Sequence, residues 1–124
     1  MPRRISPAIG RAAVERATAH APERDAIATA VRYLLQELGD RAPGRSVEVR
    51  VPPFGAAQCL AGTSHRRGTP PAVIEMDADT WIALGVGTVT WADAVQRGEV
   101  QASGERADLS QLLPLIAPVD ASPH

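Results

Sequence analysis

Lysine is absent from the sequence, aromatic residues make up only 3% of it, and there is a single cysteine. With so few aromatic side chains, the core has to be built from Val, Leu, Ile and Ala. One cysteine cannot form an internal disulfide, so no disulfide framework supports the fold. The length of 124 residues is nevertheless enough for one domain with a core of its own.

A surplus of either charge is also missing, because the formal net charge is −1 and the pI is about 6.3. This balance argues against nucleic acid as a partner, which a basic surface would bind. No hydrophobic run is long enough to span a bilayer, and neither an apolar signal region nor a lipidation motif is found. We therefore expect a cytoplasmic protein without stable membrane insertion.

A first short helix is expected near the N terminus. Ser6 can cap the free amides of a helix start, and Pro7 suits the first helical position. The Ala-rich stretch that follows runs to about Ala19 and ends before the pair Ala21 and Pro22. Its apolar face is thin and is expected to consist of Ile9, Ala13 and Ala17.

Residues 22–38 give the strongest helix prediction. Apolar residues recur in this segment at spacings of three and four, with polar residues mostly opposite. Gly39 offers the left-handed conformation in which many helices end. One face of this helix must therefore cover something apolar, and that face comprises Ile27, Ala30, Val31, Leu34, Leu35 and Leu38.

Three strands are expected in the middle of the chain. Residues 46–51 alternate valines with polar residues, which predicts a strand in a sheet with one wet face. Residues 54–61 indicate a second, more buried strand, and residues 72–76 a third.

Two short helices are expected next, each with a capping residue and a glycine stop. The first follows Asp77 and ends at Gly85 and Gly87. The second follows Thr90, a typical cap, and ends at Gly98.

A strand and a helix are expected to finish the domain. Residues 99–103 alternate as a last short strand, and Asp108 opens a helix that runs to Pro114. The order of all these elements predicts the α+β class, with a mixed, largely antiparallel sheet covered by helices.

In residues 74–115 a strand is followed by an acidic turn, two short helices with glycine stops, a short strand and a last helix. The residues that define this pattern are Asp77, Asp79, Trp81, Leu84, Gly87, Trp91, Ala94, Gly98, Val100, Gly104, Leu109, Leu112 and Leu113. In element order, spacing and turn glycines, the segment resembles the sterol carrier protein family. Upstream, residues 22–76 match that family in element order alone. The chain looks like a compact bacterial branch, related to the C-terminal domain of mycothiol-dependent maleylpyruvate isomerase-like proteins.

No repeat, linker or change of composition divides the chain, so we expect one sterol-carrier-like domain over residues 1–116, with residues 1–20 as an N-terminal helical extension and residues 117–124 as a flexible tail. The resemblance implies a non-catalytic carrier with a hydrophobic cavity between sheet and helices, which holds a sterol, fatty acid or acyl-CoA. No catalytic residue, cofactor or metal is implied. The expected cavity lining is Phe54, Leu60, Ile74, Met76, Leu84, Val95, Leu109, Leu112 and Leu113.

Catalytic interpretations of the sequence are weaker than structural ones, in which the same residues pack or cap helices. Cys59 and His65 could pair as nucleophile and base, but the strand position of Cys59 favours a buried packing role. Asp77 and Asp79 suit a helix cap and its dipole better than acid–base work. No zinc-ligand spacing relates the histidines, which are His20, His65 and His124.

A second function stays open beside the carrier. The same fold with a closed cavity would serve as an accessory or interaction domain that acts with a separate enzyme. The small residues Ala56, Ala57 and Ala61 do not decide between an open cavity and a closed core. Trp81 and Trp91 are expected to be core anchors, and the basic cluster 65–67 to be solvated loop charge.

Overall fold

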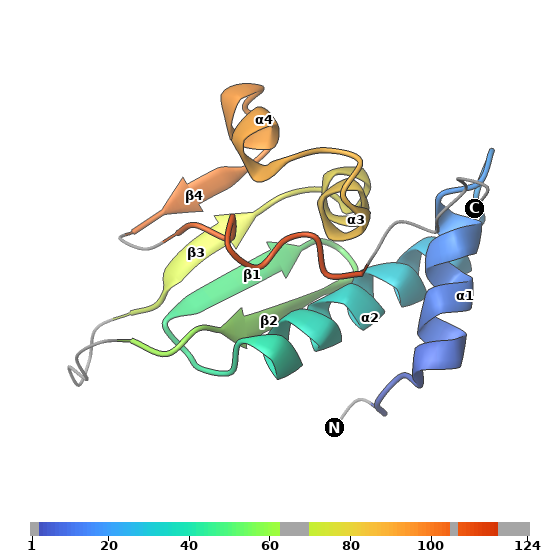
Figure 1. Cartoon of the computed structure of the whole chain (residues 1–124), viewed down its shortest axis with the longest axis horizontal. Coiled ribbons are helices and arrows are strands. Elements are labelled where there is room, and N and C mark those ends of the chain that lie inside the picture. Colours follow the sequence, from blue (N-terminus) through green and yellow to red (C-terminus); the bar gives the residue numbers. More distant parts are fainter. Residues whose placement is uncertain (1–2, 63–69, 105–106, 117–124) are drawn as a thin grey trace, which may run out of the picture.

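The computed structural model describes residues 3–62, 70–104 and 107–116, so the predicted tail 117–124 lies outside the described residues. Helices and strands follow one another in groups along the chain, and the strands join in one sheet, which confirms the predicted α+β class (Figure 1). In chain order the elements are α1 (Pro7–Ala17), α2 (Arg24–Arg41), β1 (Val47–Val51), β2 (Gly55–Cys59), β3 (Ala72–Glu75), α3 (Ala78–Val86), α4 (Trp91–Gln96) and β4 (Gln101–Ser103).

The strands of the described residues form one sheet in the order β2-β1-β3-β4. β1 pairs antiparallel with β2, and β3 pairs antiparallel with β4. The central pair, β1 and β3, is parallel. The sheet is therefore mixed and largely antiparallel, as predicted.

The alternation in β1 separates a buried face of the sheet from a wet one. Val47, Val49 and Val51 are fully buried, and Ile74 of β3 lies in register beside Val49. On the opposite face, Arg50 donates to Glu48 in an ion pair of 2.6 Å between Nε and Oε1. The predicted one-sided sheet is confirmed.

Helix α2 covers the buried face of the sheet, and α3 packs beside it. The predicted apolar stripe of α2 is buried, apart from the half-buried Ile27. Trp81 of α3 is fully buried, and its indole Nε1 donates to the carbonyl of Val31 at 3.2 Å. Trp81 is thus the core anchor that was expected, whereas Trp91 is only half-buried.

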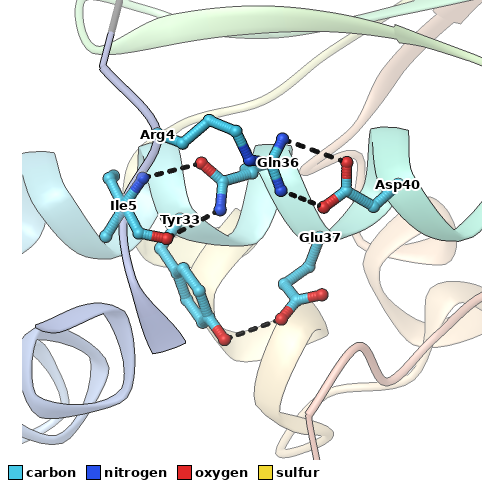
Figure 2. A network of polar contacts seen from close by, with 6 residues as sticks. All are labelled: Arg4, Ile5, Tyr33, Gln36, Glu37 and Asp40. Carbon is cyan, nitrogen blue, oxygen red and sulfur yellow. Dashed lines mark hydrogen bonds and ion pairs between the residues drawn. The ribbon is translucent and has the colours of Figure 1, made fainter. Parts of the chain in front are cut away.

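The N-terminal residues 3–17, here called the arm, pack on the side of α2 away from the sheet (Figure 2). The side-chain amide of Gln36 accepts from the Ile5 amide at 2.9 Å and donates to the Ile5 carbonyl at 2.8 Å. Arg4 makes a two-pronged ion pair with Asp40. These contacts fix the register of the arm along α2.

The apolar face of α1 agrees with the expected one in part, since Ala13 is buried and Ala17 is half-buried against the core. Ile9 is 60% exposed, while Gly10, Ala13 and Val14 are buried. Gly10 lies against the ring of Tyr33, where an added Cβ would come within 2.2 Å of ring atoms. Gly10, which packs on Tyr33, takes the inward position expected for Ile9, and the apolar pattern alone could not indicate this.

Two glycines predicted as helix stops lie inside helices instead. Gly39 is within α2, which ends at Arg41 because Pro43 disfavours a helical conformation at Ala42. Gly85 is within α3, where a Cβ would come within 2.9 Å of the Leu34 side chain. Gly87, with a φ of 85°, is the left-handed cap of α3, as predicted.

The predicted helix after Asp108 is not formed. Residues 107–116, here called the strap, run back from the end of β4 toward α3 with a single turn closed by the Leu112 amide on the Leu109 carbonyl at 2.9 Å. The amides of Leu115 and Ile116 instead donate to the Gly85 carbonyl, at 2.8 and 3.1 Å. Pro114 has no amide and disfavours a helical conformation at Leu113, so the single turn ends there and the next amides bond to α3.

Candidate functional site

The structure brings together eight of the nine side chains expected to line a cavity. Ile74, Met76, Leu84 and Leu109 are buried in the core. The exception is Val95, which is 47% exposed on α4 and lies outside this cluster. The others are half-buried and pack against the core, and they are Phe54, Leu60, Leu112 and Leu113.

A small hollow opens to solvent beside this cluster, where β2 ends and the strap turns. Its volume is about 240 Å³, and its lining is Ser46, Leu60, Ala61, Asp108 and Gln111. Pockets that enclose a drug-sized ligand usually measure roughly 300–1,000 Å³. The hollow is therefore an opening at the edge of the core and too small for a whole lipid.

Leu60 is held rigidly at the rim of this hollow. Its φ of 61° lies in the left-handed region, which a branched side chain rarely adopts. Three hydrogen bonds hold it there. The Leu60 amide donates to the Ala42 carbonyl at 2.7 Å, and the Leu60 carbonyl accepts from both the amide and the hydroxyl of Ser46, at 2.9 and 2.7 Å. The backbone at residue 44 lies close to Leu60, and only glycine fits there, because a Cβ on Gly44 would lie 2.1 Å from the Leu60 carbonyl oxygen.

The strap closes the apolar interior from one side. Leu109, Leu115 and Ile116 are buried, and they place strap side chains in the core between the sheet and the helices. At the end of α2, Arg41 donates from Nη1 to the Pro114 carbonyl at 3.2 Å and from Nη2 to the Leu115 carbonyl at 2.5 Å. The strap is thus tied to both α2 and α3.

Sequence reasoning did not single out Arg41, Leu115 or Ile116. The apolar pair that follows Pro114 is a signal that could have marked Leu115 and Ile116 as core residues. Nothing local marks Arg41, since its carbonyl partners lie more than seventy residues away along the chain.

Among the described residues that line the hollow, Asp108 is the charged one. Asp108 accepts from the Ser110 amide at 2.8 Å, and this hydrogen bond lowers the pKa of the Asp108 carboxyl. The group is therefore ionised at neutral pH, and the rim disfavours an anion.

Of the candidate acid–base pair Asp77 and Asp79, the first has a structural role. The Asp77 carboxylate accepts from the Thr80 amide at 2.8 Å and caps α3, which confirms the capping interpretation. The Thr90 hydroxyl caps α4 in the same way, at 3.1 Å from the Asp93 amide. His65, Arg66, Arg67 and His124 lie outside the described residues. Within the described ranges, no group of three His, Cys, Asp or Glu side chains is placed to hold a metal.

Cys59 is fully buried at the end of β2, as its strand setting predicted. Burial raises the pKa of its thiol to about 11, from an ordinary 9.0. At neutral pH the group is therefore a neutral thiol, which is a poor nucleophile.

Two results are expected for Cys59. The variant Cys59→Ala should lose about 1 kcal/mol of unfolding free energy, the cost of a modest core truncation. The unfolded chain releases the thiol proton at lower pH than the folded chain does, so stability should fall as pH rises from about 9 to about 11. Urea unfolding across this range measures the pH dependence of stability in both proteins. Because Cys59→Ala has no thiol, the difference between the two pH dependences is the contribution of the Cys59 thiol. Rapid labelling of the folded protein by a thiol reagent at pH 7 would contradict the buried role.

Residues 23–115 match the sequence model of a family described as bacterial SCP orthologs, SCP denoting the sterol carrier protein. The chain belongs to this family. The match covers α2, the sheet, α3, α4 and nearly all of the strap, while α1 precedes it. No curated protein matches the chain.

Membership of the SCP family confirms the resemblance on which the cavity prediction depends. It indicates a lipid-binding or carrier role in general terms. Among the described helices of this SCP-family chain, none combines the length and the apolar character needed to cross a bilayer.

Proposed function

We propose that this SCP-family protein is a non-catalytic carrier for a lipid-like ligand, such as a sterol, a fatty acid or an acyl-CoA, held between the sheet and its helices. The observation that carries the proposal is the apolar cluster on the covered face of the sheet, bordered by an open hollow and a strap without regular secondary structure. The family assignment supports the same role.

The energetics of such a site are favourable. Each buried methylene contributes about 0.8 kcal/mol, so a cavity that takes eight of them supports roughly micromolar binding after the entropy of association. The hollow adds polar groups at its rim, among them Ser46 and Gln111, where an uncharged polar group of the ligand can form hydrogen bonds.

The described interior is well filled, which favours a second candidate. Ile74, Leu84 and Leu109 are inaccessible to solvent. A closed core of this kind would suit an accessory domain that acts with a separate enzyme. The two candidates differ in one respect: the carrier has to open, and the accessory domain does not.

Native mass spectrometry of gently purified protein tests the carrier directly, because a retained lipid adds mass. Displacement of a fluorescent fatty acid then gives the affinity in solution. Binding of none of a broad lipid panel, together with protein that purifies empty, would remove the carrier and leave the accessory domain.

The half-buried Leu112 offers a test of where the ligand lies. Leu112→Trp should weaken binding by about tenfold or more, because the larger ring fills space that the ligand needs, with little change in melting temperature. Val95→Trp is the matched control, since Val95 is exposed and its replacement should leave binding unchanged. Equal affinities for both variants and the unmodified protein would place the ligand elsewhere.

A further inference from the structure

The tie between Arg41 and the strap uses two main-chain carbonyls as acceptors. Two guanidinium nitrogens donate to two consecutive main-chain carbonyls, those of Pro114 and Leu115. Both acceptors are neutral, whereas a guanidinium fork binds a carboxylate through two parallel, charge-assisted hydrogen bonds.

Within the described part of the chain, Arg41 forms no ion pair with a carboxylate. The ion pairs there join Arg4 to Asp40, Arg50 to Glu48 and Arg97 to Glu99. The acid next to Arg41 in the sequence, Asp40, is thus used by the arm (Figure 2).

The position of Arg41 connects it to the apolar interior. Leu38 of α2 and Ala42, the residue that follows the helix, are buried, and so are Leu115 and Ile116 of the strap. The carbonyls that Arg41 holds therefore belong to the segment whose side chains fill the core. An acyl chain entering from this point would take the place of apolar strap side chains, so that one set of apolar contacts replaces another.

We propose that Arg41 binds the carboxylate of a lipid acid, and that the strap carbonyls of Pro114 and Leu115 occupy this position until such a ligand displaces them. The proposal rests on the carrier function and deepens it, because it selects a fatty acid over a neutral lipid. The ionised Asp108 at the hollow supports the choice of Arg41, since a carboxylate is repelled at that rim.

The experiment compares hexadecanoate with hexadecanol, which share a chain and differ in head-group charge. The unmodified protein should bind hexadecanoate about tenfold more tightly, and Arg41→Gln should bring the two affinities together. Arg41→Lys retains the charge without the paired donors and should keep part of the preference. Arg16→Gln is the matched control, because Arg16 is likewise an exposed arginine in the last turn of a helix, and the preference should persist.

Hydrogen exchange at the amides of Leu115 and Ile116 reports whether the strap is displaced, since both amides donate to the Gly85 carbonyl in this structure. Hexadecanoate should speed their exchange. A preference that is the same in Arg41→Gln as in the unmodified protein, or no preference at all, overturns the head-group site but leaves the carrier function intact. Unchanged strap exchange with hexadecanoate bound overturns the displacement. Failure to bind either lipid overturns the carrier function, and this proposal with it.

Discussion

Replacement of Trp81 by alanine should lower the unfolding free energy by about 3–5 kcal/mol, the largest loss expected from any single change considered for this chain. The whole stability of a small domain is about 5–15 kcal/mol. Trp81 of α3 is fully buried against α2 in a core with few other large side chains. Its loss leaves a cavity, and it also removes the hydrogen bond to the Val31 carbonyl.

The other tryptophan is a natural control. Trp91 is only half-buried, so Trp91→Ala should cost about half as much or less. Trp81→Phe, which keeps a ring but loses the indole N–H, should fall between the two alanine variants. Urea unfolding measures all three, and the fluorescence of the remaining tryptophan reports the transition in each alanine variant. Equal losses for Trp81→Ala and Trp91→Ala would contradict the placement of Trp81 at the centre of the core.

The regular elements could be predicted because their signals are local. The alternation of Val47, Val49 and Val51 follows directly from a strand with one buried face. The three- and four-residue spacing in α2 follows from its contact with that face. Capping is local as well, which is why Ser6, Asp77 and Thr90 were correctly assigned.

Helix ends at glycine were less predictable, because a glycine serves more than one purpose. Gly87 ends α3 through its left-handed conformation. Gly85, two residues earlier, is needed because Leu34 of α2 packs against it. The sequence shows the same residue type at both positions, and only the tertiary contact distinguishes them.

The candidate site was predictable in part for the same reason. Apolar residues on predicted strands and helices lie in one cluster, since the covered face of a sheet collects them. Val95 belongs to a helix of only six residues, whose orientation the sequence does not determine, and the structure exposes it. The strap depends on contacts between Arg41, Gly85 and Leu115, which no local pattern encodes.

Gly10→Ala should destabilise the protein by about 1–3 kcal/mol, although alanine is the better helix former. The added methyl group would overlap the ring of Tyr33, with contacts of 2.2 to 2.6 Å. Tyr33 is buried and its hydroxyl donates to Glu37 at 2.6 Å, so the ring has little freedom to move. The strain therefore falls on the arm, which should move away from α2 and show faster hydrogen exchange across α1.

Gly39→Ala is the control with the opposite sign. Gly39 is also helical, but its nearest neighbour is the Gln58 carbonyl oxygen at 3.7 Å, an ordinary contact. Alanine there should raise stability by about 0.5–1 kcal/mol through helix propensity alone. In a Tyr33→Ala background the cost of Gly10→Ala should disappear, because the clash has no partner, while the gain from Gly39→Ala should remain. Chemical unfolding of the single and double variants measures this coupling, and an unchanged cost of Gly10→Ala without the Tyr33 ring would show that the arm is not held in register by that contact.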